Sequence, residues 1–290
     1  MERLVALDVG GTNVKYGVFH GETLLSQGQF PLDEQAPAEA LLRQLTDFVQ
    51  PLAPDILAVS MPGPMDYDRG LCLMRHKFPH LYGISLKDAL TRAMPGLRCS
   101  FVHDGAAFAM GEMACGALRG YREALVVTLG TGLEYVRCRE GRLLMLPRLT
   151  PAQPMWCMPY RSGTAEDYVS GQAIGRRWAA LSGHAATARD AAEAARSGNE
   201  SALALLEDVG CMLGELLALR CAGQAVERIV VGGQVANALD LLLPGVRRMC
   251  SVPVCRAEHP ANAALYGARL YAREDREAWF TITEEEVSAC

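Results

Sequence analysis

The chain has 290 residues, half of them hydrophobic and 21% charged, which is the composition of a globular protein with a substantial core. This length accommodates two modest domains or one large one. The formal net charge of −5 argues against general nucleic-acid binding, which needs a basic face. The N-terminal apolar run is too short for a signal peptide, and no stretch approaches the roughly 20 apolar residues that span a bilayer. Ten cysteines without C-x-x-C pairs are typical of reduced thiols, so we expect a cytoplasmic protein that handles a small molecule.

The chain begins with a pattern typical of a β-hairpin. Residues 4–9 and 14–19 are rich in Val and Leu, and Gly10-Gly11-Thr12-Asn13 separates them. Glycine suits such a turn because it adopts positive φ angles at little cost. Asp8 is the polar residue of an otherwise apolar strand. Its carboxylate either faces the water shell of a Mg²⁺ ion or caps the turn.

A strand–helix boundary follows further along the chain. The pattern predicts helices at 36–49 and 86–94, strands at 56–60 and 99–103, and a helix from residue 106. His103-Asp104-Gly105 lies where the second of these strands ends. An Asp before Gly-Ala-Ala-Phe is a good helix N-cap, and local chemistry alone favours that role for Asp104 over a catalytic one.

Residues 123–144 repeat the opening plan, with a strand, Gly130-Thr131-Gly132, a second strand and a further turn at Glu140-Gly141. A third strand ends in Gly232-Gly233 before an apparent helix. None of these turns is a P-loop or a G-x-G-x-x-G motif. Their backbone N–H groups, with a Thr hydroxyl beside them, could nevertheless hold phosphate oxygens. The repeated plan and the alternation of strands and helices predict an internally duplicated α/β chain.

Six motifs stand in order along the chain: LDVGGTNVKYGVF, MPGPMDYDRG, HDGAAFAMGE, VVTLGTG, GTAEDYVSGQAIG and RIVVGGQVA. In this order and spacing, over residues 3–272, the chain resembles the ROK family of sugar kinases. The resemblance implies an actin-like (ribonuclease-H-like) α/β fold with two domains and a central cleft. We expect one domain at 1–116 plus a C-terminal helix at 261–273, a second at 117–260, and a solvated acidic tail at 274–290.

The resemblance also implies ATP, Mg²⁺, phosphoryl transfer to a sugar hydroxyl, and a homodimer, with no nucleic-acid or membrane partner. Some family members are repressors with a preceding winged helix, for which we expect no room before Gly10. The residues that match nucleotide-binding positions of the family are Asp8 (also the Mg²⁺ position, through water), Gly10, Gly11, Thr12, Lys15, Gly130, Thr131, Gly132, Gly232 and Gly233.

On the sugar side, the resemblance makes Asp104 the catalytic base, which takes the proton of the attacking hydroxyl. Gly63 and Glu166 match positions that line the sugar and bind its hydroxyls. His103 replaces the usual Asn, and it either contacts a sugar hydroxyl or merely fills the end of the strand. His76 lies in the segment that closes over the sugar, where it contacts substrate or belongs to an exposed basic loop.

Three departures from the family pattern bear on activity. The usual zinc motif C-x-C-G-x-x-G-C is CMPYRSGT at 157–164, which keeps only Cys157, so we predict no zinc. The usual sugar-contacting E-x-x-H is absent at 148–151. Glu134 replaces a glycine after the second turn, where its carboxylate either repels ATP or points away. These changes leave open a second hypothesis, a non-catalytic sugar- or nucleotide-binding sensor.

Overall fold

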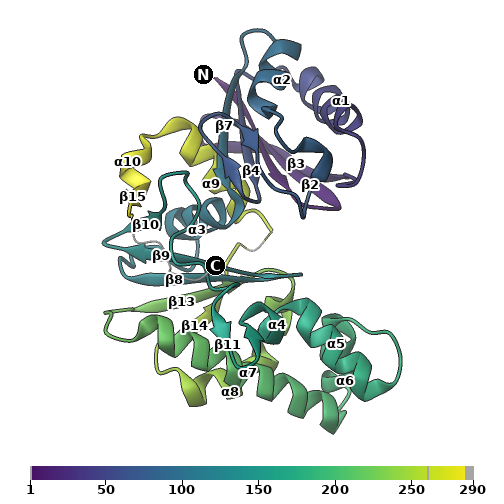
Figure 1. The fold of residues 1–290 in the computed structure, drawn as a ribbon. Coiled ribbons are helices and arrows are strands. Elements are labelled where there is room, and N and C mark those ends of the chain that lie inside the picture. Colours follow the sequence, from purple (N-terminus) through teal and green to yellow (C-terminus); the bar gives the residue numbers. More distant parts are fainter. Residues whose placement is uncertain (1, 260, 285–290) are drawn as a thin grey trace. The chain divides into compact units, whose positions relative to one another are not determined.

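The computed structural model describes residues 2–259 and 261–284, which divide into two compact units (Figure 1). Among these residues the first unit comprises 2–116, 142–151 and 261–284. The second comprises 117–141 and 152–259. Each unit is built on a sheet with helices against it, which confirms the predicted α/β class.

The sheet of the first unit has the order β3-β2-β1-β4-β7. Its strands are β1 (Arg3–Val9), β2 (Asn13–His20), β3 (Thr23–Pro31), β4 (Ile56–Met61) and β7 (Arg98–His103). The first hairpin pairs antiparallel, whereas β1, β4 and β7 run parallel. Their carboxyl ends therefore meet at one edge of the sheet. The strand β3 was not predicted, because most of its residues are exposed and show no apolar alternation.

Helices cover both faces of this sheet. They are α1 (Ala38–Val49), α2 (Leu86–Ala93), α3 (Asp104–Cys115) and α9 (Ala263–Arg273). The helix predicted from residue 36 begins at Ala38, after Pro37, which has no N–H to give to a helix. In Figure 1, α3 and α9 lie side by side. A Cβ on Gly111 or Gly267 would collide with the backbone of the opposite helix, so these two glycines permit the close approach.

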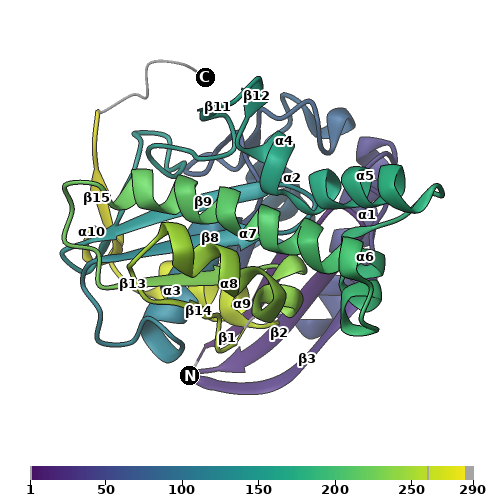
Figure 2. The same cartoon turned by 90° about the horizontal axis from the view of Figure 1, so that it is seen from below.

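The sheet of the second unit has the order β14-β13-β8-β9. Its strands are β8 (Ala124–Leu129), β9 (Leu133–Arg139), β13 (Arg228–Gly232) and β14 (Val254–Arg256). Its helices are α4 (Glu166–Val169), α5 (Gly171–Ser182), α6 (Ala188–Arg196), α7 (Glu200–Cys221) and α8 (Leu239–Met249). Figure 2 shows α7 and α8 side by side across β8 and β13. Their apolar faces form the core with Leu125, Val127 and Ile229 of the sheet.

Shorter elements complete the chain. They are β5 (Met65–Asp66), β6 (Leu71–Cys72), β10 (Arg142–Met145), β11 (Pro159–Tyr160), β12 (Gly163–Thr164), α10 (Arg276–Trp279), β15 (Phe280–Ile282) and the 3-10 turns η1 (Gln50–Leu52), η2 (Pro79–Leu81) and η3 (Val235–Ala238). The solvated tail expected from residue 274 is wrong as far as residue 284. There, β15 pairs parallel with β10, and buried Phe280 stacks on Tyr271 with ring centroids 5.5 Å apart. Residues 285–290 of the expected tail lie outside the described residues.

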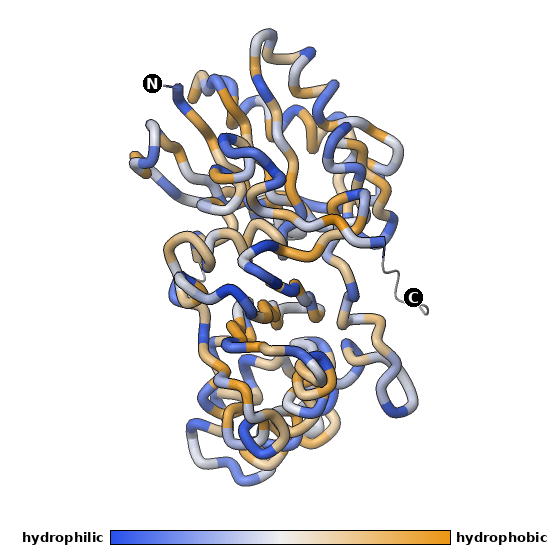
Figure 3. Tube along the Cα trace, turned by 90° about the vertical axis from the view of Figure 1, so that its left-hand side faces the viewer, coloured by the Kyte–Doolittle hydropathy of each residue, from blue (hydrophilic) through white to orange (hydrophobic). Residues whose placement is uncertain are grey.

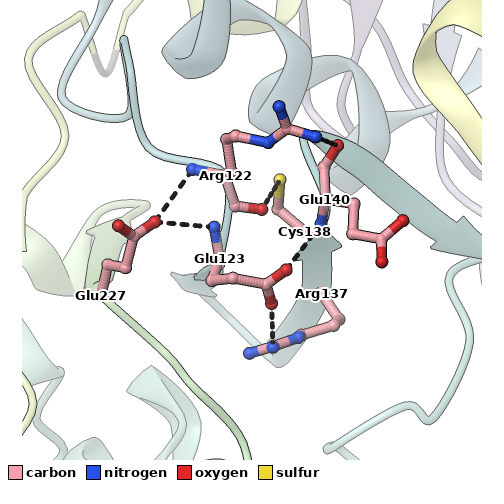
Figure 4. Close-up of polar contacts among 6 residues, drawn as sticks. All are labelled: Arg122, Glu123, Arg137, Cys138, Glu140 and Glu227. Atoms are coloured by element: carbon pink, nitrogen blue, oxygen red, sulfur yellow. Dashed lines mark hydrogen bonds and ion pairs between the residues drawn. The ribbon is translucent and has the colours of Figure 1, made fainter.

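A polar network joins the strand ends of the second sheet (Figure 4). Glu227 accepts hydrogen bonds from the backbone N–H groups of Arg122 and Glu123, both at 3.0 Å. The Glu123 carboxylate accepts one from the Glu140 N–H at 2.7 Å and pairs with Arg137 at 2.6 Å. The Arg137 side chain is only 2% exposed, and its Nε and Nη1 have no hydrogen-bond partner among the described residues. One carboxylate thus holds a deeply buried cation.

Hydropathy follows this architecture. In Figure 3, hydrophobic stretches run through the interior of each unit, and hydrophilic stretches are commonest on the outer turns and helices. No helix in the described ranges is both long enough and apolar enough to cross a bilayer.

Candidate active site

The polar residues predicted for the first half of the site gather at the carboxyl ends of β1, β4 and β7. Asp8 on β1 is paired in register with Lys15 on β2 and with Ser60 on β4. The Ser60 hydroxyl donates a hydrogen bond to Asp8 Oδ1 at 3.1 Å. The next strand, β7, ends at His103, directly before Asp104. The carboxyl ends of parallel strands are where ligands bind in open α/β sheets.

Asp8 is held in an environment that suits a cation. Burial is the main reason that its pKa lies above the usual range, and the nearby Asp104 raises it further. Lys15, followed by the Ser60 hydrogen bond, opposes this rise in pKa. Two half-buried carboxylates within electrostatic reach of each other provide oxygen ligands and a negative potential. This donor set fits a hydrated Mg²⁺ ion, which prefers oxygen ligands and retains water.

The first glycine turn lies directly beyond Asp8. The Gly10 N–H donates to the Asn13 carbonyl at 3.0 Å, which closes the turn between β1 and β2. The Gly11 carbonyl accepts a bond from the Glu34 N–H at 3.2 Å. A Cβ on Gly11 would collide with the Glu34 carboxylate. The turn was predicted from its glycines, whereas the Glu34 carboxylate beside it was not, because the chain after β3 brings it there.

The local interpretation of Asp104 as an N-cap is wrong, because His103 occupies the cap position of α3. Its Nδ1 accepts a hydrogen bond from the Gly105 N–H at 3.1 Å. Asp104 is the first residue of the helix, and its Oδ1 accepts from the same N–H at 2.8 Å. The Asp104 side chain is 36% exposed, so one oriented carboxylate remains accessible at the end of β7.

His103 is a neutral hydrogen-bond donor in this arrangement. Burial is the main reason that the pKa of His103 lies below its usual value. The negative charge of Asp104 opposes this shift, and the positive charge of Lys77 adds to it. The neutral ring accepts at Nδ1, so its proton is on Nε2. A Cβ on Gly63 would lie 3.5 Å from this Nε2 and 3.1 Å from the Tyr67 hydroxyl. Gly63 thus leaves room at the edge of the imidazole.

Tyr67 is a member of this group that the sequence did not indicate. Its hydroxyl donates to the Met61 carbonyl at 3.1 Å, and its ring packs edge-on against His103 with centroids 5.8 Å apart. His76, by contrast, is exposed, and the cation that acts on the pKa of His103 is its neighbour Lys77. The sequence prediction of a substrate contact at His76 stays a prediction.

The second glycine turn, Gly130 to Gly132, lies in contact with Glu166. Gly130 N–H donates to the Gly132 carbonyl at 3.0 Å, and the turn joins β8 to β9. Glu166 Oε2 accepts a hydrogen bond from the Leu133 N–H at 2.8 Å. A Cβ on Gly132 would collide with that same Oε2, whereas one on Gly130 would meet nothing within 4 Å. The carboxylate predicted to bind sugar hydroxyls therefore lies directly on the predicted phosphate turn.

The third glycine turn has a structural reason of its own. Gly233 has φ of 84°, and a Cβ there would collide with the Leu129 carbonyl at the end of β8. Glycine is needed at this position whether or not a nucleotide binds. Gly232 is the last residue of β13, beside Thr128 of β8.

The comparisons with known proteins agree with this fold. The model of the ROK family matches residues 4–145 and 146–272, and the chain belongs to the ROK family. It is 26% identical over 294 residues to the N-acetylmannosamine kinase of Yersinia pestis (strain Pestoides F), covering 94% of this chain and 99% of that protein.

Solved structures show the same architecture. The ROK hexokinase from Thermus thermophilus superposes with a TM-score of 0.75 at 25% identity, covering 93% of this chain and 97% of the hexokinase. A ROK family glucokinase from Streptomyces griseus, in complex with glucose and AMPPNP, gives a TM-score of 0.77 at 23% identity, covering 94% and 100%. These similarities confirm the predicted actin-like two-domain α/β fold.

Proposed function

We propose that this chain is an ATP- and Mg²⁺-dependent kinase that phosphorylates a hydroxyl of a hexose or hexose-like sugar, with Asp104 as general base. The observation that carries the proposal is the partly exposed Asp104 carboxylate, oriented by the Gly105 N–H at the carboxyl end of β7. Membership of the ROK family and similarity to proteins named as sugar kinases support it.

In the proposed reaction, Asp104 accepts the proton of a sugar hydroxyl as the oxygen attacks the γ-phosphorus of ATP, and ADP leaves. A positioned base of this kind contributes about 10²–10⁴-fold in rate. The Nε2–H of His103 donates to a sugar oxygen beside Gly63, and the Glu166 carboxylate accepts from sugar hydroxyls. His76 is retained as a candidate sugar contact, although it is exposed.

The nucleotide is assigned to the glycine turns, whose backbone N–H groups suit phosphate oxygens. Mg²⁺, when bound, neutralises charge on the phosphates, and Asp8 would hold it through water. The residues assigned to the nucleotide are Gly10, Gly11, Thr12, Lys15, Gly130, Thr131, Gly132, Gly232 and Gly233. We further propose a homodimer without zinc. Among the described residues, eight cysteines are free thiols, which favours a reducing compartment such as the cytoplasm, whereas Cys157 is disulfide-bonded.

The test is an ATP-consumption screen across hexoses and N-acetylhexosamines, followed by identification of the phosphorylated product. D104N should abolish turnover of any active sugar while nucleotide binding, measured by calorimetry, stays close to that of the wild type. Turnover that survives in D104N would exclude Asp104 as the base.

One observation favours a second candidate, a sensor that binds sugar without phosphorylating it. The Glu34 carboxylate lies against Gly11, and a negative charge beside a phosphate turn opposes ATP binding. A sensor should bind a sugar in calorimetry and yield no phosphorylated product with any sugar tested. In the kinase, E34Q should strengthen ATP binding, whereas in a sensor it should leave the lack of product unchanged.

A further inference from the structure

The segment that corresponds to the family's zinc motif, residues 157–164, has side chains that do not fit a zinc ion. Pro159 and Thr164 stand in two of the cysteine positions, and neither offers a thiolate. Within 2–259 and 261–284, no group of three metal-ligating side chains includes Cys157. Residues 159–164 instead form the small antiparallel hairpin of β11 and β12.

Aromatic and polar contacts hold this hairpin together. The rings of Tyr160 and Tyr168 meet edge to face, with centroids 5.4 Å apart at 82°. The guanidinium of Arg161 lies 5.2 Å from the centroid of the Tyr160 ring and 5.7 Å from that of Tyr168. Ser162 Oγ and the Tyr168 hydroxyl share a hydrogen bond of 2.7 Å. We call Tyr160, Arg161 and Tyr168 the aromatic brace.

The brace is anchored to the long helix α7. The Tyr160 hydroxyl donates a hydrogen bond of 2.5 Å to Glu215 Oε2. Burial and this same bond raise the pKa of Tyr160 to about 12, so the phenol keeps its proton and remains a donor at neutral pH. A hydrogen bond to a charged carboxylate is stronger than one between neutral groups.

The residues on either side of the brace set the start of α4, the helix that begins at Glu166. Asp167 Oδ2 accepts hydrogen bonds from the N–H and the hydroxyl of Thr164, at 2.9 and 2.8 Å. The Glu166 N–H donates to the Trp156 carbonyl at 3.2 Å. The Trp156 carbonyl, three residues before the hairpin, therefore holds the backbone of Glu166, while the Leu133 N–H holds its carboxylate.

We infer that Tyr160 is a positioning residue for Glu166, and that its bond to Glu215 anchors, without a metal ion, the segment that leads into α4. The inference deepens the proposed function and rests on it, since Glu166 is the carboxylate proposed to bind sugar hydroxyls. Tyr160 acts only through Glu166 and α4, so it should affect sugar binding rather than proton transfer.

The experiment compares Y160F with the wild type and with Y266F, a matched removal of a hydroxyl from Tyr266, which packs on Phe19 in the first unit. We expect Y160F to raise KM for the sugar about tenfold, as for loss of one charge-assisted bond, with kcat within about twofold. E215Q should reproduce the effect, and Y160F/E215Q should add little to it. Y266F should leave both constants unchanged.

Amide exchange gives a readout that needs no activity. The Leu133 N–H donates to Glu166, so its exchange should accelerate about tenfold in Y160F, while the Val126 N–H in the core strand β8 serves as the control. An active enzyme in which Y160F changes neither KM nor Leu133 exchange would overturn the inference. A wild type without product for any sugar would overturn the proposed function, and Leu133 exchange would still decide the role of Tyr160. One tightly held zinc per chain in metal analysis would overturn the metal-free part.

Discussion

Replacing Gly132 by Ala is expected to displace Glu166 with little harm to the fold. The new methyl group would overlap Glu166 Oε2, with the carboxyl carbon 3.3 Å away. The collision involves the far end of a flexible side chain, so the carboxylate can swing aside. It then loses its 2.8 Å bond from the Leu133 N–H. A bond of this charged kind contributes about 1.5–3 kcal/mol, so the sugar affinity that depends on the placed carboxylate should fall about ten- to hundredfold.

Gly130, two residues earlier in the same turn, supplies the matched control. A Cβ there meets nothing within 4 Å, so G130A leaves Glu166 in place. Calorimetry should be run with sugar and with nucleotide separately on both variants. G132A should lose sugar affinity, whereas G130A should keep it even if nucleotide binding weakens. Equal sugar affinity in G132A and the wild type, or an equal loss in both variants, would refute the reasoning.

Three further predictions concern charge and burial. E123Q leaves the buried Arg137 cation without its carboxylate, so denaturant titration should show a free energy of unfolding lower by about 3 kcal/mol. R137M removes the buried charge itself and should lower the free energy of unfolding much less. The pKa of His103 is lowered in the fold, so the unfolded chain binds more protons than the folded chain below about pH 6.5. The free energy of unfolding should therefore fall on acidification, and it should fall less steeply in H103Q. The pKa of Asp8 is raised in the fold, so the ionised carboxylate destabilises the folded chain at neutral pH. D8N should therefore have a higher melting temperature than the wild type, together with weaker Mg²⁺–ATP binding. A lower melting temperature in D8N would contradict this reasoning.

The glycine hairpins could be predicted because their signals are local. Val-rich strands flank Gly10 to Asn13 and Gly130 to Gly132, and both turns form where the residues indicate. The strand β3 could not be predicted in the same way, since its side chains face solvent and its pairing with β2 depends on the hairpin already formed. The strand β15 was hidden for a similar reason. Its partner β10 lies far back in the sequence.

Among the site residues, too, some have a local signal in the sequence and others depend on contacts made only in the fold. Asp8 stands out in the sequence as the polar residue of an apolar strand, whereas Asp104 is a candidate only through the family resemblance, since its local pattern favours a cap. The cap of α3 was assigned to the wrong residue, because imidazole is an uncommon cap and Asp a common one. Only the folded chain brings together the loops that place Tyr67 beside His103, Glu34 beside Gly11, and the Glu166 carboxylate beside Gly132. No spacing in the sequence indicates them.

The central claim is that Asp104 accepts the proton of a sugar hydroxyl. The most direct test is single-turnover phosphoryl transfer from labelled ATP to the best sugar of the screen, in the wild type and in D104N. The account predicts labelled sugar phosphate with the wild type and a rate at least about 10²-fold lower with D104N, at unchanged sugar and nucleotide affinity. Comparable rates in the two proteins, or a wild type that binds sugar and never labels it, would contradict the account.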